Sequence, residues 1–396
     1  MSVLQEKHIT LIVTGSIAAY KACEIVRLLR KTGALVHVIL TQAAERFVGA
    51  ATFEALSGNP VLTDTNHVPL AHIHFAQDAC DLILVAPASA NSLAKIASGI
   101  ADNLACETIA ARTVPLLVAP AMNTAMWENP ATCRNVRLLK EDGVLFAGPV
   151  SGSLACGTNG AGRMIEPEAV VQAAEKALTK PILAGKKILV TAGPTYEAID
   201  PVRGLTNRSS GRQGYAVAQA AYAAGADVTL VTGPVSLTPP YGVSVIAVES
   251  ARDMQNAVSS RLAGTDAFIG VAAVADWRPS HPVMHKIKKD TDGVPPLVLC
   301  ANPDILALVA ASPNRPTCVV GFAAETENEV EHAQAKLKKK GLDLIVANNA
   351  PNTFGKKVNR ATLITADSVR ELPEMDKTDL SREIISCVAH LLEGRQ

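Results

Sequence analysis

Two short apolar runs in the first half of the chain end in nearly the same loop. Residues 82–85 lead into Val-Ala-Pro-Ala-Ser-Ala-Asn at 85–91, and residues 116–119 lead into Ala-Pro-Ala-Met-Asn at 119–123. Proline has no N–H to donate, so it ends a strand at each point. Loops at the carboxyl ends of parallel strands form the ligand crevice of an open α/β sheet. The two loops predict a pocket for a flat ligand with polar edges, although such loops also occur without a ligand.

Composition narrows the class of protein. The 396 residues suffice for two or three domains, and Lys+Arg equals Asp+Glu at 37, so no net charge attracts nucleic acid. Residues 1–8 lack the pattern of a signal peptide, and no apolar run approaches the roughly 20 residues of a membrane helix. The eight cysteines include no Cys-x-x-Cys pair. The scattered cysteines favour reduced thiols. Together with the balanced charge and the short apolar runs, they predict a cytoplasmic protein with neither a nucleic-acid nor a membrane partner.

Apolar strands alternate with amphipathic helices in both halves of the chain. This rhythm predicts an α/β protein with two doubly wound parallel-sheet domains. The rhythm stops in a glycine-rich segment at 149–163, where we expect a polar loop, and it restarts after a helix. We therefore expect domains over residues 1–180 and 181–396. The elements that define the pattern are strands at 9–13, 35–40, 188–191 and 228–231, and helices at 17–30, 168–178 and 215–224.

Small and hydroxyl residues stand where the first strands meet their helices. Gly15 and Ser16 follow the first strand, where free backbone amides at a helix start can hold a phosphate. Thr41 and residues 89–92 add hydroxyl and amide groups around a ring or ribityl chain. The absence of Gly-x-Gly-x-x-Gly favours a mononucleotide over a dinucleotide. The alternative is that Gly15 serves only a tight turn.

Two histidines and one cysteine carry candidate chemistry. His72 and His74 have no third metal ligand nearby, so a general base or charge-stabilising imidazole is favoured over a metal site. The alternative is ordinary polar residues at a helix start. Cys156 lies in the glycine-rich segment, and its thiol is a candidate proton donor there. The alternative is an inert, packed thiol.

The first half resembles the flavin-dependent cysteine decarboxylases, including the phosphopantothenoylcysteine decarboxylases. In that family FMN oxidises the thiol-bearing carbon, CO₂ leaves, and the hydride is returned. One departure from the family pattern is Phe75 in place of Leu, with His74 between it and the His-Ile pair. The motifs are Gly-Ser-Ile-Ala-Ala-Tyr-Lys at 15–21, His-Ile at 72–73, Pro-Ala-Ser-Ala-Asn at 87–91, Pro-Ala-Met-Asn-Thr-Ala-Met-Trp at 120–127 and Ala-Cys-Gly at 155–157.

This resemblance implies a flavodoxin-like flavoprotein domain with specific residue roles. It implies that His72 aids oxidation and decarboxylation, that Asn123 holds the substrate carboxylate and amide, and that Cys156 donates a proton in the final reduction. It further implies that Met126 contacts the substrate. The implied FMN contacts are Gly15, Ser16, Thr41, Ser89, Ala90, Asn91, Ser92 and Ala121.

Loops and charges in the second half suit a nucleotide. Residues 191–195 follow a strand and residues 206–214 precede a helix, where amides, hydroxyls and Arg can meet a phosphate. A plain capping loop is an equal alternative, and no Gly-x-x-x-x-Gly-Lys-Ser/Thr occurs. Asp276 ends an apolar run, where an acid could meet ribose or a metal-bound triphosphate. Lys336 and Lys340 share one helix face; they either bind phosphates or stabilise the helix C-terminus.

The second half resembles the bacterial phosphopantothenate–cysteine ligases, so nearly the whole chain resembles the fused decarboxylase–ligases of coenzyme A biosynthesis. The family implies a Rossmann-like domain that uses CTP and Mg²⁺ to activate 4'-phosphopantothenate as an acyl-cytidylate, which cysteine attacks. It implies that Asn207 serves this step and that Lys286, Lys336 and Lys340 bind triphosphate. The implied nucleotide pocket is Gly270, Val271, Ala272, Asp276, Pro303, Asp304, Ile305, Leu306 and Phe322. The motifs are Thr-Ala-Gly-Pro-Thr at 191–195, Asp-Pro-Val-Arg at 200–203, Thr-Asn-Arg-Ser-Ser-Gly at 206–211, Ala-Ala-Val-Ala-Asp-Trp at 272–277, Lys-Ile-Lys at 286–288, Asn-Pro-Asp-Ile-Leu at 302–306, Gly-Phe-Ala-Ala-Glu-Thr at 321–326 and Asp-Leu-Ile-Val-Ala-Asn at 343–348.

The resemblance also implies a homo-oligomer. Flavin sits where N-terminal halves meet as trimers that build a dodecamer, and C-terminal halves pair as dimers. Two other functions stay open: a binding protein that keeps flavin for structure, and a flavoprotein acting on another peptide-like thiol. The presence of His72, Asn123 and Cys156 together argues for the enzyme. Base preference and metal ligands do not follow from the residues.

Overall fold

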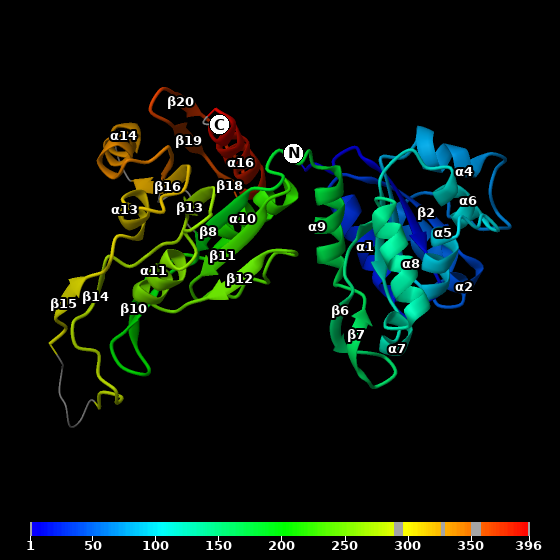
Figure 1. Ribbon diagram of the computed structural model, residues 1–396, viewed down its shortest axis with the longest axis horizontal. Helices are drawn as coiled ribbons and strands as arrows, with labels where there is room; N and C mark the ends of the chain where they lie inside the picture. The colour runs from blue at the N-terminus through cyan, green and yellow to red at the C-terminus, as the bar shows by residue number, and fades with distance from the viewer. Residues whose placement is uncertain (1, 289–295, 326–328, 350–357, 395–396) are drawn as a thin grey trace. The chain divides into compact units, whose positions relative to one another are not determined.

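The computed structural model describes residues 2–288, 296–325, 329–349 and 358–394 (Figure 1). The chain forms two compact units, Met1–Thr179 and Lys180–Gln396, one residue from the boundary expected at 180. Within the described residues, no helix combines the length and apolarity that crossing a membrane requires.

The N-terminal unit is built on a sheet of parallel strands in the order β2-β1-β3-β4-β5. The central strands are continuous apolar runs because helices cover both of their faces. This order is the flavodoxin-like one, and it reverses between β1 and β3, where such folds bind ligands. The expected fold of this half is confirmed. The strands are β1 His8–Val13, β2 Leu35–Leu40, β3 Leu82–Ala88, β4 Leu116–Pro120 and β5 Leu145–Phe146.

Helices cover the two faces of this sheet. Helices α1 and α9 pack together on one face, and α5, α6 and α8 bury residues such as Leu93, Ile109 and Leu139 on the other (Figure 1). Asparagine and serine caps begin the second group, since Ser89, Asn103 and Asn129 each accept a backbone N–H. The helices are α1 Ala19–Lys31, α2 Gln42–Glu45, α3 Ala50–Ser57, α4 Ala71–Ile73 with the π-helical turn η1 His74–Asp78, α5 Ala90–Ala97, α6 Leu104–Ala110, α7 Thr124–Trp127, α8 Pro130–Glu141 and α9 Pro167–Leu178.

The glycine-rich segment that we expected to be a loop forms an antiparallel hairpin. Its strands are β6 Val150–Ser153 and β7 Asn159–Arg163. A Cβ on Gly162 would lie 2.4 Å from the Met122 oxygen, and one on Gly160 would lie 2.5 Å from Thr124 Oγ1. The expectation was wrong because these glycines allow close packing of β7 against the segment after β4, rather than chain disorder.

The C-terminal unit is built on a larger sheet in the order β12-β11-β8-β13-β16-β17-β19-β20. The strands from β12 to β17 are parallel, in the order of a Rossmann fold, whereas β19 and β20 add an antiparallel edge that we did not predict. The order reverses between β8 and β13. The strands are β8 Lys187–Ala192, β11 Asp227–Thr232, β12 Ser244–Ala247, β13 Ala267–Gly270, β16 Cys318–Glu325, β17 Leu344–Asn349, β19 Ala361–Ile364 and β20 Val369–Glu371.

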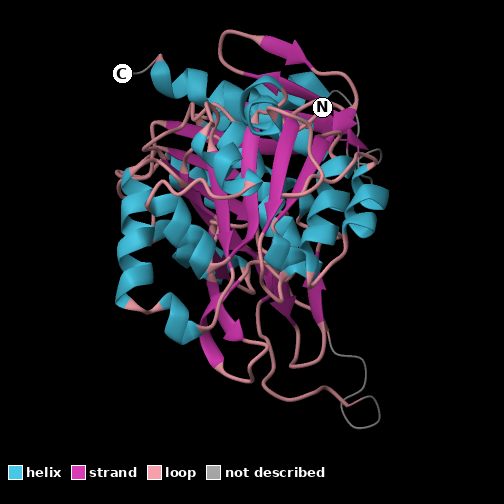
Figure 2. Ribbon diagram, turned by 90° about the vertical axis from the view of Figure 1, so that its right-hand side faces the viewer, coloured by secondary structure: helices cyan, strands magenta, loops and turns pink. Residues whose placement is uncertain are grey.

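Helices again cover both faces. α10 (Arg212–Ala223) and α16 (Lys377–Glu393) share one core, and α11 (Ala251–Ser259), α13 (Ile305–Ala310) and α14 (Glu329–Lys340) share the other. A Cβ on Gly214 would lie 2.5 Å from Ala192 Cβ, so glycine lets α10 lie close against β8. Short strand pairs complete the unit: β9 Tyr196–Ala198 with β10 Gly204–Thr206, β14 Trp277–Pro279 with β15 Leu299–Ala301, and β18 Val358–Asn359 with β21 Met375–Asp376. The β14–β15 pair projects from the main sheet (Figure 2).

Candidate active sites

A cavity of about 640 Å³ lies at the reversal point of the N-terminal sheet. We call it the hairpin cavity, because β6 and β7 form one of its walls. The loops after β1, β3 and β4 form the others, as the strand order predicts. Its lining includes eight of the residues singled out from the sequence: Gly15, Ser16, Ser89, Ala90, Ala121, Asn123, Met126 and Cys156.

Asn123 and Cys156 meet in this cavity although 33 positions separate them. Asn123 caps α7, where its Oδ1 accepts the Ala125 N–H at 2.8 Å. The cap turns the amide nitrogen outward, and Nδ2 donates to Cys156 Sγ at 3.0 Å. Cys156 lies at the exposed tip of the hairpin, 3.1 Å from Thr158 Oγ1. The capping bond thus orients an amide that contacts the thiol from outside the hairpin.

Hydrogen bonding tunes the Cys156 thiol. Bonds from the Thr158 hydroxyl and its backbone N–H, followed by the Asn123 amide, lower the pKa of Cys156 from its usual value. A donor aimed at sulfur stabilises the thiolate, so the thiol becomes a better acid. The inert, packed alternative does not fit an exposed thiol with a lowered pKa. The chemistry of the site therefore suits proton donation by this thiol.

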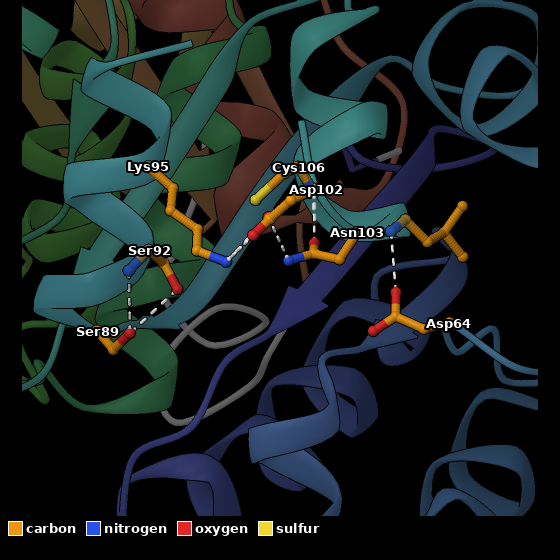
Figure 3. A network of polar contacts seen from close by, with 8 residues as sticks. Asp64, Ser89, Ser92, Lys95, Asp102, Asn103 and Cys106 are labelled. Atoms are coloured by element: carbon orange, nitrogen blue, oxygen red, sulfur yellow. Dashed lines mark hydrogen bonds and ion pairs between the residues drawn. The ribbon is translucent and has the colours of Figure 1, made fainter. Parts of the chain in front are cut away.

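A second cavity of about 460 Å³, which we call the α5–α6 cavity, shares lining residues with the first. Figure 3 shows polar contacts among residues that line it. Gly15, Ser89, Ala90 and Met126 line both. Ser89 Oγ accepts the Ser92 N–H at 3.2 Å and lies 3.0 Å from Ser92 Oγ. The other predicted flavin residues, Thr41, Asn91 and Ser92, line this second cavity together with the ion pair of Lys95 and Asp102 at 2.6 Å.

The two cavities fit a flavin mononucleotide. Hydroxyls of Ser16, Thr41, Ser89 and Ser92 can meet a polyol chain, and Met126 offers apolar surface for a ring. Each of the eight predicted flavin contacts lines at least one cavity. A Cβ on Gly15 would lie 2.5 Å from Ala43 Cβ, so packing against α2 already requires glycine there. The tight-turn explanation of Gly15 therefore holds without excluding a ligand.

His72 is the exception among the predicted catalytic residues. It lines neither cavity and lies on α4, where its Nδ1 is 3.9 Å from Glu107 Oε2 of α6. Within the unit, Figure 1 draws α4 and α6 at one end and α7, β6 and β7 at the other. His74 Nδ1 lies 3.7 Å from Asp78 Oδ2, and the centroid of the Phe75 ring lies 5.0 Å from that of the His37 ring. One copy of the chain does not bring His72 to Cys156.

A cavity of about 800 Å³, the C-terminal cavity, lies at the reversal point between β8 and β13. It gathers loops that are far apart in sequence. Arg208 also lines it; this residue belongs to the 206–214 loop that we expected to meet a phosphate, although we did not name it as a site residue. The predicted residues in its lining are Asn207, Gly270, Ala272, Asp276, Pro303, Asp304, Ile305, Leu306, Phe322, Lys336 and Lys340.

Specific contacts hold this cavity in shape. Asn207 Nδ2 donates to the carbonyls of Ala273 at 3.1 Å and Val274 at 3.2 Å, which ties the loop after β10 to the loop after β13. Lys336 Nζ donates to the Phe322 oxygen at 2.9 Å, and Lys340 pairs with Asp304 at 2.6 Å. Both lysines thus face the cavity, which favours phosphate binding over simple stabilisation of the helix end.

Two predicted residues lie outside the C-terminal cavity. Val271 packs into the core beneath α10 and α16 instead. Lys286 is exposed on residues 280–288, which follow the projecting β14; positions 289–295 lie outside the described residues. The buried Asp200 carboxylate anchors this segment, because it accepts the Ile287 N–H at 3.2 Å and pairs with Arg203 at 2.5 Å. Arg203 in turn donates to the Ile287 oxygen at 2.9 Å.

Metal ligands do not gather in the described ranges. No group of three or more His, Cys, Asp or Glu side chains there could hold a metal ion, including the segment around His72 and His74. A metal in the C-terminal cavity would depend on ligands that the nucleotide brings.

Comparisons with known proteins address both units. Residues 2–179 match the family model described as Flavoprotein, and residues 183–392 match the DNA/pantothenate metabolism flavoprotein C-terminal domain. The coenzyme A biosynthesis bifunctional protein CoaBC of Bacillus subtilis is 46% identical over 98% of this chain and 98% of its own length. The crystal structure of a CoaBC C-terminal domain is 41% identical, covering 54% of this chain and 100% of that one with a TM-score of 0.47. A mutant PPC decarboxylase, solved with pantothenoylaminoethenethiol, is 33% identical over 43% of this chain and 97% of its own, with a TM-score of 0.39.

Proposed function

The chain belongs to the family of bifunctional coenzyme A biosynthesis proteins, and from this premise we propose how its two units divide the work. The enzyme joins cysteine to 4'-phosphopantothenate and decarboxylates the product to 4'-phosphopantetheine. We assign FMN-dependent decarboxylation to residues 1–180 and CTP-dependent ligation to residues 181–396. Each assignment rests on a cavity built wholly within one unit, at the reversal point of its sheet.

The contact between Cys156 and Asn123 carries the decarboxylase assignment. Bound FMN supplies the reversible hydride transfer that lets a carboxylate without an electron sink leave as CO₂. Asn123, oriented by its capping bond, holds the substrate carboxylate and amide beside the thiol. Cys156 then gives its proton to the product during the final reduction, helped by its lowered pKa. A flavin kept only for structure would not require this acid.

We infer that a neighbouring copy supplies His72. Apolar side chains are exposed at two separate places: Ile17 and Tyr20 in the wall of the hairpin cavity, and Val68 and Leu70 beside His72. Tyr20 is 61% exposed and Leu70 69%. Contact between two different surfaces of one chain is heterologous, and it closes a ring when the rotation allows. A trimer made this way would bring His72 to the cavity of the next copy, in keeping with the proposed trimer-based dodecamer.

The C-terminal cavity suits a nucleoside triphosphate and an acyl intermediate. Arg208, Lys336 and Lys340 can neutralise phosphates, and Asp276 can meet ribose or the metal. Asn207, held against two carbonyls, lies where it can contact the acyl-cytidylate. Mg²⁺ would accompany CTP through its phosphates, since it usually binds few protein carboxylates. Lys286 reaches this cavity only if its segment moves or a second copy in the proposed dimer supplies it.

A cytoplasmic location fits the cysteines. The structure describes all eight, and each is a free thiol. Proteins kept in a reducing compartment retain such thiols.

The direct test follows both reactions in one vessel. The full chain, FMN, 4'-phosphopantothenate, cysteine, CTP and Mg²⁺ are incubated, and the products are weighed by mass spectrometry. We expect 4'-phosphopantetheine, CMP and one CO₂ for each cysteine. Residues 1–180 and 181–396, expressed apart, should each keep one activity, the first as an FMN-binding trimer. Ligation that needs both fragments would refute the division of work, and the absence of both products would refute the function.

A further inference from the structure

The hairpin cavity differs from its neighbour in charge. Two cations, Lys21 and Arg163, line it, and none of its lining residues is Asp or Glu. In the α5–α6 cavity, by contrast, the lining includes two carboxylates, Asp64 and Asp102, and one lysine, Lys95, which pairs with Asp102. The positive charges of the hairpin cavity therefore favour the binding of an anion, whereas the carboxylates of the α5–α6 cavity disfavour the binding of a dianion.

Lys21 is a buried cation with a fixed position. Its side chain is only 10% exposed on α1, and Nζ donates to the Glu166 carboxylate at 2.9 Å and to the Met164 oxygen at 3.4 Å. Removing an ammonium group from water is costly unless partners replace the water. These two partners fix the position of Nζ instead of letting it extend into solvent, and Lys21 is among the residues that line the cavity.

Arg163 reaches the same carboxylate from the base of the hairpin. Its Nη2 donates to Glu166 Oε1 at 2.6 Å. Its side chain lies over Gly152 of β6, where a Cβ would come within 3.3 Å of both Cδ and Nη1. Glycine at 152 thus leaves the space that the guanidinium group occupies. Two cations share one carboxylate that does not itself line the cavity, which leaves one uncompensated positive charge.

We propose that Lys21 and Arg163 form a subsite for a phosphate monoester in the hairpin cavity. The guanidinium fork and the ammonium group both donate to phosphate oxygens, and a dianion balances the excess positive charge. This inference rests on the proposed decarboxylase function, because it names the part of the substrate that binds there.

The substrate carries two anionic groups, a phosphate and a carboxylate, and the chemistry of decarboxylation indicates that Lys21 and Arg163 bind the phosphate. The carboxylate loses its charge as CO₂ leaves, so a strong cation pair on it would stabilise the bound substrate more than the transition state. The phosphate keeps its charge throughout, so its binding energy does not oppose the reaction. A remote anion is the group that a fixed cation pair can hold without a kinetic penalty.

Two molecules in the proposed reaction carry a phosphate monoester: the substrate and FMN. The hairpin favours the substrate, because β7 carries Arg163 at its base and Cys156 lies at its tip. One hairpin then holds both the distant phosphate and the acid that serves the reacting end. The experiment separates the two sources by omitting the phosphate from each in turn.

The test measures binding by calorimetry, without turnover. The FMN-loaded full chain is titrated with 4'-phosphopantetheine and with pantetheine, neither of which has a carboxylate. We expect the unchanged protein to prefer the phosphorylated form. Arg163→Gln should weaken 4'-phosphopantetheine binding about ten- to hundredfold and leave pantetheine binding unchanged. Lys21→Met should act in the same direction.

A further variant and a matched control distinguish loss of the subsite from loss of the folded structure. Gly152→Ala keeps both charges but crowds the guanidinium group, so it should reduce the preference by a smaller factor. Arg137→Gln, which removes an exposed arginine 3.9 Å from Glu141, should change neither affinity. FMN and riboflavin binding to the flavin-free chain, followed by fluorescence, tests the other source. If only the advantage of FMN over riboflavin falls, the subsite holds the cofactor's phosphate.

Arg163→Gln and Lys21→Met variants with unchanged preferences for both phosphorylated ligands would overturn the subsite. Equal weakening of phosphorylated and unphosphorylated forms would also overturn it, because the residues would then act only on structure. Failure of the proposed function is a separate result, since it would appear as an absence of CO₂ release while these affinities could still be measured.

Discussion

Both units form their cavity from loops at the point where the strand order of the sheet reverses, but they differ in how many predicted catalytic residues one copy brings to that cavity. In the C-terminal unit, one copy gathers Asn207, Lys336 and Lys340 around one cavity and leaves only Lys286, of the predicted catalytic residues there, outside it. In the N-terminal unit, one copy gathers Asn123 and Cys156 but leaves His72 on the distant α4. The comparison teaches that a sheet's reversal point determines where loops converge. His72 lies on an outlying helix, and we propose that assembly with a second copy brings it to a site.

The largest expected effect tests whether the N-terminal site is shared between copies. His72→Asn should stop CO₂ release, and Cys156→Ser should allow it but block the final reduction, with losses of about 10²–10⁴-fold in complete turnover. When the two variants are mixed in equal amounts and assemble together, about a quarter of the contacts between copies should pair an intact His72 with an intact Cys156. Those sites should be active. Turnover of mixed and separate variants measures this.

Two outcomes would contradict that picture. No recovery after verified mixing would place His72 and Cys156 of one chain in the same site, or His72 outside the site. Loss of CO₂ release in His74→Asn but not in His72→Asn would transfer the proposed role to His74.

The next effect tests whether the C-terminal site works independently. Asn207→Ala removes an amide that donates to two carbonyls and faces the cavity, so ligation should fall about 10²–10³-fold. Decarboxylation of added 4'-phosphopantothenoylcysteine should stay unchanged. Parallel assays of the two reactions on one sample make the measurement, and an equal fall in both would contradict the separation of the units.

A smaller effect concerns the anchor beneath Lys286. Arg203 holds the pKa of Asp200 well below its usual range, and Asp200→Asn removes that charge. We expect this change to lower the stability of the C-terminal unit, because the Arg203 guanidinium and the Ile287 N–H lose a charged acceptor. Because the folded pKa is lowered, the contribution is present above the unfolded pKa of about 3.9 and is lost as the pH falls through the folded value. The measurement is the free energy of unfolding in urea, for the parent and the Asp200→Asn variant, at pH 7 and at pH 3. An equal difference between the two proteins at both pH values would refute the prediction.

The smallest effect sharpens the role of Cys156. Thr158→Val removes the hydroxyl bond that most lowers the Cys156 pKa, so that pKa should rise. A proton donor is active below its pKa, so the decline of the reduction step at alkaline pH should move to higher pH. The pH–rate profile of that step measures the shift. An unmoved profile would mean that another group supplies the proton.

Local pattern was sufficient to predict most elements and loops of both sites. Strand 35–40 was predicted with its observed bounds, and the loops after β1, β3, β4 and β13 line the cavities in which we expected them. The signal exists because side-chain period and proline or glycine stops are properties of adjacent residues. Our placement of Val271 in the nucleotide pocket was wrong. Consecutive residues near a strand end face opposite sides of the sheet, and Val271 packs against the core.

The sequence by itself determined the class of each fold, the strand-end loops and the residue types available for chemistry. Only the tertiary structure decided which residues meet: Cys156 with Asn123, Lys21 and Arg163 on one carboxylate, and His72 apart from them all. The contacts of Cys156 with Asn123 and of Lys21 with Glu166 join segments far apart in the chain, and they depend on how closely the backbones approach. The glycines of β7 set that approach through packing, and nothing in the spacing of the sequence encodes it.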